Sequence, residues 1–269
     1  MNSRFKTIKN LFIDSVEINN FVELDVTKRL YERLEESLDK PLKMVLLFGK
    51  PGTGKSMMLN KLVINLKNKR EIHYFEAPIL TEKEFLKSIY EAISSKSVPA
   101  NLRVNFDGLL KYVQSLKGKR EIVFLLDECQ LYSEALMEKI RLLSDTRVIK
   151  FVITLHKTED EDLIAKEHFK TRIWDVIELE NANLDELHLY IQKKLMGEGF
   201  IEVSNMFTQK VVKLIHKYTN GNFRETNKFL YTLFEIYEFY EINEPHRVSL
   251  DKMSKKIFEM SALKLGYLK

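Results

Sequence analysis

Five short hydrophobic runs alternate with longer amphipathic stretches over the first two thirds of the chain. The runs have the length of strands, and they lie at residues 43–48, 71–75, 121–126, 148–155 and 174–179. Several are apolar on both faces, which is typical of a parallel sheet with a helical layer on each side. The stretches between them repeat with the period of a helix, as at residues 26–38, where leucines are four positions apart. The pattern predicts an α/β fold with a five-stranded parallel sheet sandwiched by helices.

The strand pattern stops after the fifth run, and only helix-like stretches follow. They lie at residues 183–197, 207–218, 223–240 and 250–263. The first of them begins with Asn183 and Glu186 in the spacing of a capping box. We therefore expect an α/β core over residues 1–180, which includes an N-terminal segment and helix at 1–40, and a small all-helical domain over residues 181–269.

Composition and charge narrow the class of protein. Hydrophobic residues make up 45% and charged residues 30% of the chain, as in globular proteins. The net charge of +4 is small for a dedicated nucleic-acid binder, so it permits DNA as a partner without favouring it. The single cysteine excludes an intrachain disulfide, the polar N-terminus is unlike a signal peptide, and no apolar run has membrane-spanning length. We therefore expect a cytoplasmic protein.

One glycine-rich segment predicts a phosphate-binding loop. It follows the first hydrophobic run, precedes a helix-like stretch and matches G-x-x-x-x-G-K-[ST] in full, as Gly49-Lys50-Pro51-Gly52-Thr53-Gly54-Lys55-Ser56. Its glycines let backbone amides turn toward anionic oxygens, and the following helix adds partial positive charge. We expect Lys55 to contact the β- and γ-phosphates and Ser56 to bind Mg²⁺. The expected nucleotide-binding residues are Gly49, Pro51, Gly52, Thr53, Gly54, Lys55, Ser56 and Met57.

Two acidic residues, Asp127 and Glu128, directly follow the third hydrophobic run. Ligands of parallel sheets lie at the carboxyl ends of the strands. We expect Asp127 to hold Mg²⁺ and Glu128 to polarise the attacking water, which indicates ATP hydrolysis rather than binding alone. The alternative is an acidic pair that caps a helix, and the phosphate-binding loop upstream disfavours it.

These motifs, and several shorter segments, resemble the AAA+ ATPases over about residues 20–265. More narrowly, the chain is similar to the branch that contains the secretion-associated ExeA/GspA ATPases and the transposition ATPases MuB/TniB. The segments that carry this resemblance are Leu126-Asp127-Glu128-Cys129-Gln130, Arg141-Leu142-Leu143-Ser144, Lys170-Thr171-Arg172-Ile173, Gly221-Asn222-Phe223-Arg224-Glu225-Thr226-Asn227 and Ala262-Leu263-Lys264-Leu265-Gly266-Tyr267. Phe223 departs from the proline that the family usually has at this position.

The resemblance implies catalytic roles for residues outside the two motifs. A polar sensor-1 residue at the end of the fourth strand is expected to face the γ-phosphate; His156 fits this position best, and Thr154 is the second candidate. Arg172 resembles the arginine finger that acts across a subunit interface, with a solvated or ion-paired surface arginine as the alternative. Arg224 resembles the sensor-2 arginine, which contacts the γ-phosphate in cis.

The resemblance also implies a function. It suggests an ATP hydrolase that binds Mg-ATP between core and lid, forms a homo-oligomer and drives or switches a macromolecular assembly of the secretion, pilus or flagellar type. The implied cofactors are ATP and Mg²⁺, and the implied partners are further copies of the chain and a protein partner that holds it at the membrane. Two alternatives remain: an ATP-dependent DNA-binding regulator of the MuB/TniB type, and a nucleotide-binding switch with little turnover. Glu128 disfavours the switch, because binding alone does not need a water-polarising acid.

Overall fold

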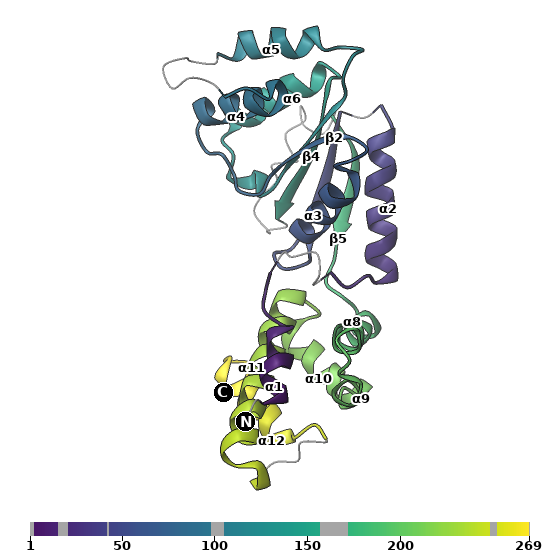
Figure 1. Cartoon of the computed structure of the whole chain (residues 1–269), viewed down its shortest axis with the longest axis vertical. Helices are drawn as coiled ribbons and strands as arrows, with labels where there is room; N and C mark the ends of the chain where they lie inside the picture. Colours follow the sequence, from purple (N-terminus) through teal and green to yellow (C-terminus); the bar gives the residue numbers. More distant parts are fainter. Residues whose placement is uncertain are drawn as a thin grey trace. The chain divides into compact units, whose positions relative to one another are not determined.

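The computed structural model describes residues 3–15, 21–41, 43–97, 105–156, 172–247 and 252–268. The internal contacts divide the chain into two compact units (Figure 1). The sheet unit contains Thr27–Pro51 and Lys55–Leu179, and the helical unit contains Met1–Val26, Gly52–Gly54 and Glu180–Lys269. Within the described ranges, every helix is too short or too polar to cross a bilayer.

The sheet unit is built on a five-stranded parallel sheet, which confirms the predicted fold class. Its strands are β1 (Met44–Gly49), β2 (Glu71–Phe75), β3 (Ile122–Leu126), β4 (Ile149–His156) and β5 (Ile173–Leu179). They are arranged in the order β2-β3-β4-β1-β5, and all four pairings are parallel. Every residue of β3 is buried because helices cover both faces of the sheet.

Helices form one layer on each face of this sheet (Figure 1). Alternate strand residues point to opposite faces. Val123 and Leu125 therefore pack in the cluster of one layer, while Phe124 packs in the cluster of the other. The first layer contains α2 (Asp25–Asp39) and α3 (Lys55–Leu66), and the second contains α4 (Glu82–Ser94), α5 (Phe106–Ser115) and α6 (Glu134–Asp145).

The strand order places β4 between β1 and β3, and this arrangement positions the candidate site. Gly49 at the end of β1 pairs with His156, and Leu126 at the end of β3 pairs with Ile153. The residues that follow β1 and β3 therefore lie at the same edge of the sheet, on either side of the last residues of β4. Ligands of open α/β sheets lie at this edge.

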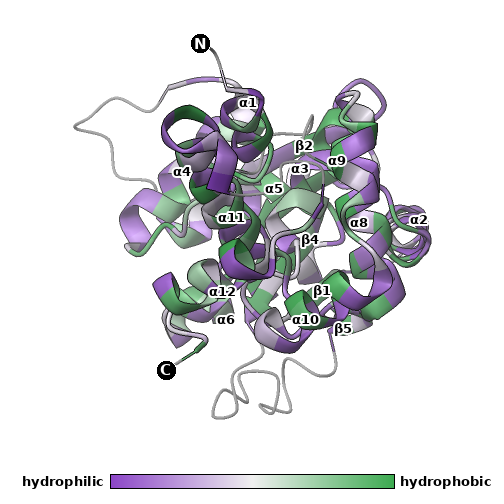
Figure 2. Ribbon diagram, turned by 90° about the horizontal axis from the view of Figure 1, so that it is seen from below, coloured by the Kyte–Doolittle hydropathy of each residue, from purple (hydrophilic) through white to green (hydrophobic). Residues whose placement is uncertain are grey.

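The helical unit contains no strand among its described residues. Its helices are amphipathic, as the mixture of hydrophobic (green) and hydrophilic (purple) residues along α8 and α11 shows in Figure 2. They are α1 (Arg4–Asn10), α8 (Leu184–Gly197), α9 (Ile201–Asn205), α10 (Gln209–Thr219), α11 (Phe223–Asn243) and α12 (Lys255–Lys264). The aromatic residues of α11 mostly fill this unit's core, since Phe229, Phe234 and Tyr237 are fully buried.

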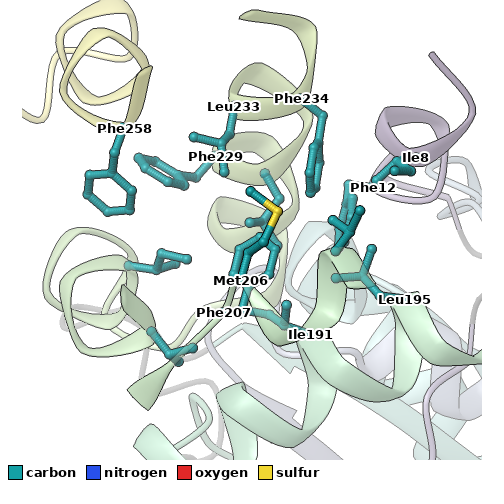
Figure 3. Packing of buried hydrophobic residues seen from close by; sticks show 14 of the residues in the cluster. Ile8, Phe12, Ile191, Leu195, Met206, Phe207, Phe229, Leu233, Phe234 and Phe258 are labelled. Carbon is teal, nitrogen blue, oxygen red and sulfur yellow. The ribbon is translucent and has the colours of Figure 1, made fainter. Parts of the chain in front are cut away.

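Helix α1 differs from the expectation for the N-terminal segment. We expected residues 1–40 to belong to the core, whereas Met1–Val26 group with the helical unit. Phe5, Ile8 and Phe12 are at most 1% exposed and pack in the same cluster as α11. Figure 3 shows Phe12 beside Phe234, with the two ring centroids 5.6 Å apart. A helix of seven residues is unstable alone, so this contact with α11 stabilises it.

Candidate nucleotide site

The glycine-rich loop connects β1 to α3, as the motif predicted. Gly52 and Gly54 have φ angles of +79° and +97°, in the left-handed region that glycine adopts without steric cost. Lys55 begins α3 and is only 4% exposed. Its ammonium donates hydrogen bonds to the carbonyl oxygens of Gly49 (2.8 Å) and Lys50 (3.0 Å). The loop therefore surrounds a buried cation with neutral oxygens.

The other predicted loop residues differ in exposure. Thr53 is buried and Pro51 is exposed, while Ser56 and Met57 are half-buried in the first turn of α3. Ser56 is the second residue of α3. It therefore lies at the N-terminal end of the helix, where the helix dipole is positive. Backbone amides at such a helix start are suited to anionic oxygens.

Asp127 is a buried carboxylate that accepts hydrogen bonds from neutral groups. It is 3% exposed, and its oxygens accept from the Thr154 hydroxyl, the Tyr74 hydroxyl (3.2 Å) and the Glu128 backbone N–H (3.0 Å). Burial, followed by the charge of Asp127, raises the pKa of Tyr74 far above its ordinary value, so this hydroxyl remains a donor. Our sequence reasoning missed Tyr74. No local pattern marks this residue, because its contact depends on the pairing of β2 with β3.

A divalent cation fits this set of groups. Within the described ranges, the partners of Asp127 are the three neutral donors named above, and its negative charge has no cationic partner. The carboxylate of Asp127 and the hydroxyl of Ser56 are hard oxygen ligands of the kind that Mg²⁺ prefers. When bound, the cation would neutralise charge that develops on phosphate oxygens.

Glu128 has a left-handed backbone, with φ of 54° and ψ of 40°. Its N–H donates to Asp127 Oδ1 and to Thr154 Oγ1, each at 3.0 Å. Its carboxylate contacts Nε2 of His156 at 3.0 Å and accepts a hydrogen bond from the amide nitrogen of Gln130. The two sensor-1 candidates thus contact different acids: the Thr154 side chain contacts Asp127, and the His156 side chain contacts Glu128.

The charge of Lys55 also reaches this cluster. Burial is the main cause that lowers the pKa of His156 below its ordinary value, and the Lys55 ammonium is the second. The sheet unit thus brings five of the predicted site residues to one edge of the sheet; these are Lys55, Asp127, Glu128, Thr154 and His156.

Arg172 lies elsewhere, at the amino end of β5. Its guanidinium is 3.7 Å from the carboxylate of Asp145, the last residue of α6. Burial would raise the pKa of Asp145, but a hydrogen bond from Lys43 and the charges of Lys43 and Arg172 outweigh it and hold that pKa below its ordinary value. Because the strands are parallel, the amino end of β5 is opposite the edge that carries the phosphate-binding loop.

Arg224 belongs to the helical unit, where it is the second residue of α11. Its Nε donates to a carboxylate oxygen of Asp14 at 2.8 Å. Asn222 caps α11 by accepting a hydrogen bond from the N–H of Glu225 at 3.2 Å. Phe223 occupies the first helical position, where a proline is also tolerated, and its ring packs against Tyr190 at 4.8 Å between centroids. The exchange of the family's proline for phenylalanine therefore leaves the helix start intact.

Known proteins share part of this sequence and its fold. The AAA domain family model matches residues 38–162. The general secretion pathway protein A of Aeromonas hydrophila is 26% identical over 190 residues, which cover 66% of this chain and 34% of that protein. The chain therefore aligns with about a third of the length of this relative.

Solved structures share the fold at lower identity. Cdc6p from Pyrobaculum aerophilum has a TM-score of 0.65 at 17% identity, covering 87% of this chain and 66% of that one. The Orc1 protein of Aeropyrum pernix in complex with DNA has a TM-score of 0.65 at 13% identity, covering 96% and 69%. The RuvB Holliday junction branch migration motor of Thermotoga maritima has a TM-score of 0.58 at 16% identity, covering 94% and 73%. These solved structures share the fold of the chain. The AAA domain family model matches residues 38–162, which contain both the phosphate-binding loop and the acidic end of β3.

Proposed function

We propose that this chain binds Mg-ATP, hydrolyses it and uses the cycle to switch a macromolecular assembly. One observation supports this proposal most directly: Lys55 is far in the sequence from the adjacent residues Asp127 and Glu128, yet the strands that precede them end at the same edge of one sheet, on either side of β4. A P-loop that only held phosphate would need neither acid at this edge.

Each group suits one task in the reaction. The Lys55 ammonium donates hydrogen bonds to the carbonyl oxygens of Gly49 and Lys50, so the loop holds it where the β- and γ-phosphates would bind. Ser56 and Asp127 supply oxygen ligands to Mg²⁺. The Glu128 carboxylate polarises the attacking water and accepts its proton, and general bases of this kind contribute ~10²–10⁴ in rate.

Self-association completes the proposed mechanism. Arg172 lies at the sheet edge opposite its own phosphate-binding loop, so it suits a site on another copy of the chain. An arginine finger supplied by a neighbour contributes ~10³–10⁵ in rate in related enzymes. Hydrolysis in a homo-oligomer would then depend on assembly, and ATP would report the assembled state to a partner.

The relative points to the kind of partner. The protein of Aeromonas hydrophila is named for the general secretion pathway, which supports a role in a secretion-type envelope assembly. We therefore propose that this chain is cytoplasmic and binds a protein partner at the membrane.

A DNA-dependent role is the second candidate, and one surface favours it. Lys210, Lys213 and Lys217 are exposed on α10 at positions i, i+3 and i+7, and α10 contains no acidic residue. A row of lysines suits the phosphates of nucleic acid, and such binding weakens steeply as salt increases.

Substitution of Lys55 and Glu128 tests ATP binding and hydrolysis separately. Lys55→Ala should abolish ATP binding, because it removes the phosphate-binding cation. Glu128→Gln should retain binding and lower turnover by ~10²–10⁴, because the amide cannot accept the proton. Calorimetry with magnesium present measures binding, and phosphate release measures turnover. Lys67→Ala, at an exposed lysine just beyond α3, is the matched control and should behave as wild type.

Two results would contradict the proposal: no uptake of ATP by the wild-type chain, or unchanged hydrolysis in Glu128→Gln. The same phosphate-release assay, repeated with double-stranded DNA at 50 and 200 mM salt, separates the two candidate functions. Stimulation that is lost at the higher salt would favour the DNA-dependent role over the secretion-type one.

A further inference from the structure

Three side chains form a closed hydrogen-bonded ring beside the phosphate-binding loop. Glu128 follows β3, Gln130 lies in the short turn Cys129–Leu131, and His156 is the last residue of β4. The amide nitrogen of Gln130 contacts Oε2 of Glu128 and also lies 3.2 Å from Nδ1 of His156. Nε2 of His156 lies 3.0 Å from Oε1 of Glu128. Each carboxylate oxygen therefore has one partner within the ring.

The chemistry of these atoms determines which of them carries the protons. The Gln130 amide nitrogen can only donate, so Nδ1 of His156 accepts and the ring proton of the imidazole resides on Nε2. Nε2–H then donates to Glu128. Burial, and secondly the charge of Lys55, lower the pKa of His156, which favours the neutral imidazole that these two contacts require.

The opposite orientation of the Gln130 amide is disfavoured. It would place the carbonyl oxygen against a carboxylate oxygen and an imidazole acceptor. In the orientation observed, Gln130 Oε1 is buried and has no hydrogen-bond partner among the described residues. A buried acceptor without a partner destabilises a fold by ~1–3 kcal/mol. This glutamine therefore directs its donors at Glu128 and His156 at a cost to stability, which is a feature of functional sites rather than of structural ones.

We propose that Gln130 is a positioning residue for the Glu128 carboxylate and that it acts together with His156. This inference rests on the proposed hydrolysis of ATP. The backbone of Glu128 is held by its N–H bonds to Asp127 and Thr154, and the ring holds the other end of the side chain. Each carboxylate oxygen keeps a free lone pair for a water, since an ionised carboxylate offers about four acceptor sites.

This role also accounts for His156. We expected this residue to contact the γ-phosphate, and its contacts in the structure are with Glu128 and Gln130. Both residues then affect turnover through the orientation of Glu128, and neither contributes to ATP affinity.

The test is a double-substitution cycle between Gln130 and Glu128. Gln130→Leu is close in size and lacks both donors. It should lower kcat by ~10–100-fold, because misplacement of a reacting group by about 1 Å costs up to this much. The affinity for ATP should change less than about two-fold, and the melting temperature should stay the same or rise, because the unpaired oxygen is removed. Gln114→Leu, at an exposed glutamine of α5, is the matched control and should leave kcat unchanged.

The second arm uses Glu128→Gln as the background. Single-turnover hydrolysis should then show no further loss when Gln130→Leu is added, since the residue that Gln130 orients no longer acts as a base. An equal loss in both backgrounds, an effect on ATP affinity alone, or a faster Gln130→Leu enzyme would each overturn the proposal. Gln130→Asn, which keeps an amide but is one methylene too short, provides the same comparison if Gln130→Leu does not fold. Failure of the proposed function itself is distinct, because Glu128→Gln would then hydrolyse ATP as fast as wild type.

Discussion

At the scale of single residues, the surroundings of a charged group set its protonation, and Lys194 in the helical unit is the clearest case. It is 8% exposed, and its ammonium donates to the Tyr190 hydroxyl at 3.1 Å. It also lies 5.4 Å from the ring centroid of Phe12. Burial lowers the pKa of Lys194 to about 8, against a weaker opposing effect of Asp14. The Tyr190 hydroxyl in turn donates to Asn227 at 2.8 Å, which joins α8 to α11.

This shift predicts a pH dependence of stability. Between pH 8 and 10 the unfolded chain keeps Lys194 protonated, whereas the folded chain loses this proton. The folded state then binds fewer protons, so the free energy of unfolding should rise with pH, by roughly 1 kcal/mol per pH unit from this residue. Urea unfolding at a series of pH values measures the slope. Lys194→Met should flatten it, while Lys193→Met, at the exposed neighbour, should keep it; equal slopes in both variants would contradict the assignment.

At the scale of elements, the turn between α10 and α11 depends on one glycine. Asn220 and Gly221 both have positive φ angles, of 50° and 70°. The Ala182 N–H donates to the Gly221 carbonyl oxygen at 3.0 Å, which holds the chain entering α8 against this turn. A Cβ at Gly221 would lie 1.9 Å from the carbonyl oxygen of Ala182. The turn therefore requires glycine for space as well as for conformation.

Two glycine substitutions separate these requirements. Gly199 also has a positive φ, of 81°, but a Cβ there would meet nothing within 4 Å. Gly199→Ala should therefore cost only the conformational strain, ~1–2 kcal/mol. Gly221→Ala adds a steric clash with backbone and should cost at least about 2 kcal/mol more. The midpoints of denaturant unfolding compare the two variants, and equal losses would show that the turn relaxes around the added methyl group.

At the scale of the whole molecule, the position of Arg172 predicts that copies of the chain share a site. The residue pairs with Asp145 and lies at the edge of the sheet opposite its own loop. An arginine placed in this way is either a structural ion pair or a group presented to a neighbour. A mixing experiment distinguishes these two roles.

Arg172→Ala and Lys55→Ala should each be nearly inactive alone, the first through loss of the finger and the second through loss of ATP binding. An equal mixture should recover up to about a quarter of wild-type hydrolysis, because that share of interfaces joins an intact loop to an intact finger. Phosphate release after mixing measures the recovery. A mixture of Lys55→Ala with Glu128→Gln is the control. Both substitutions damage the nucleotide site of the subunit that carries them, so no subunit has an intact site and hydrolysis should not recover. An active Arg172→Ala enzyme would assign the residue to a structural ion pair.

The parts of the site that could be predicted are those that are contiguous in the sequence. The loop at residues 49–56 and the acids after β3 carry their geometry in local residue types: glycines that permit positive φ, and charged groups at the ends of apolar strands. Tyr74 and Gln130 could not be assigned in this way. Their roles depend on the pairing of β2 with β3 and on the closeness of β4, and no local pattern records either.

The sequence by itself determined the number and type of most elements, the phosphate-binding loop and the acids that face it, because period, propensity and motif spacing act over a few neighbouring residues. Only the tertiary structure decided that α1 packs with α11 and that the end of β4 lies between loop and acids. It also decided that Glu128, Gln130 and His156 share one hydrogen-bonded ring. These features depend on contacts between distant segments, where burial of apolar surface and the pairing of strands outweigh local preference.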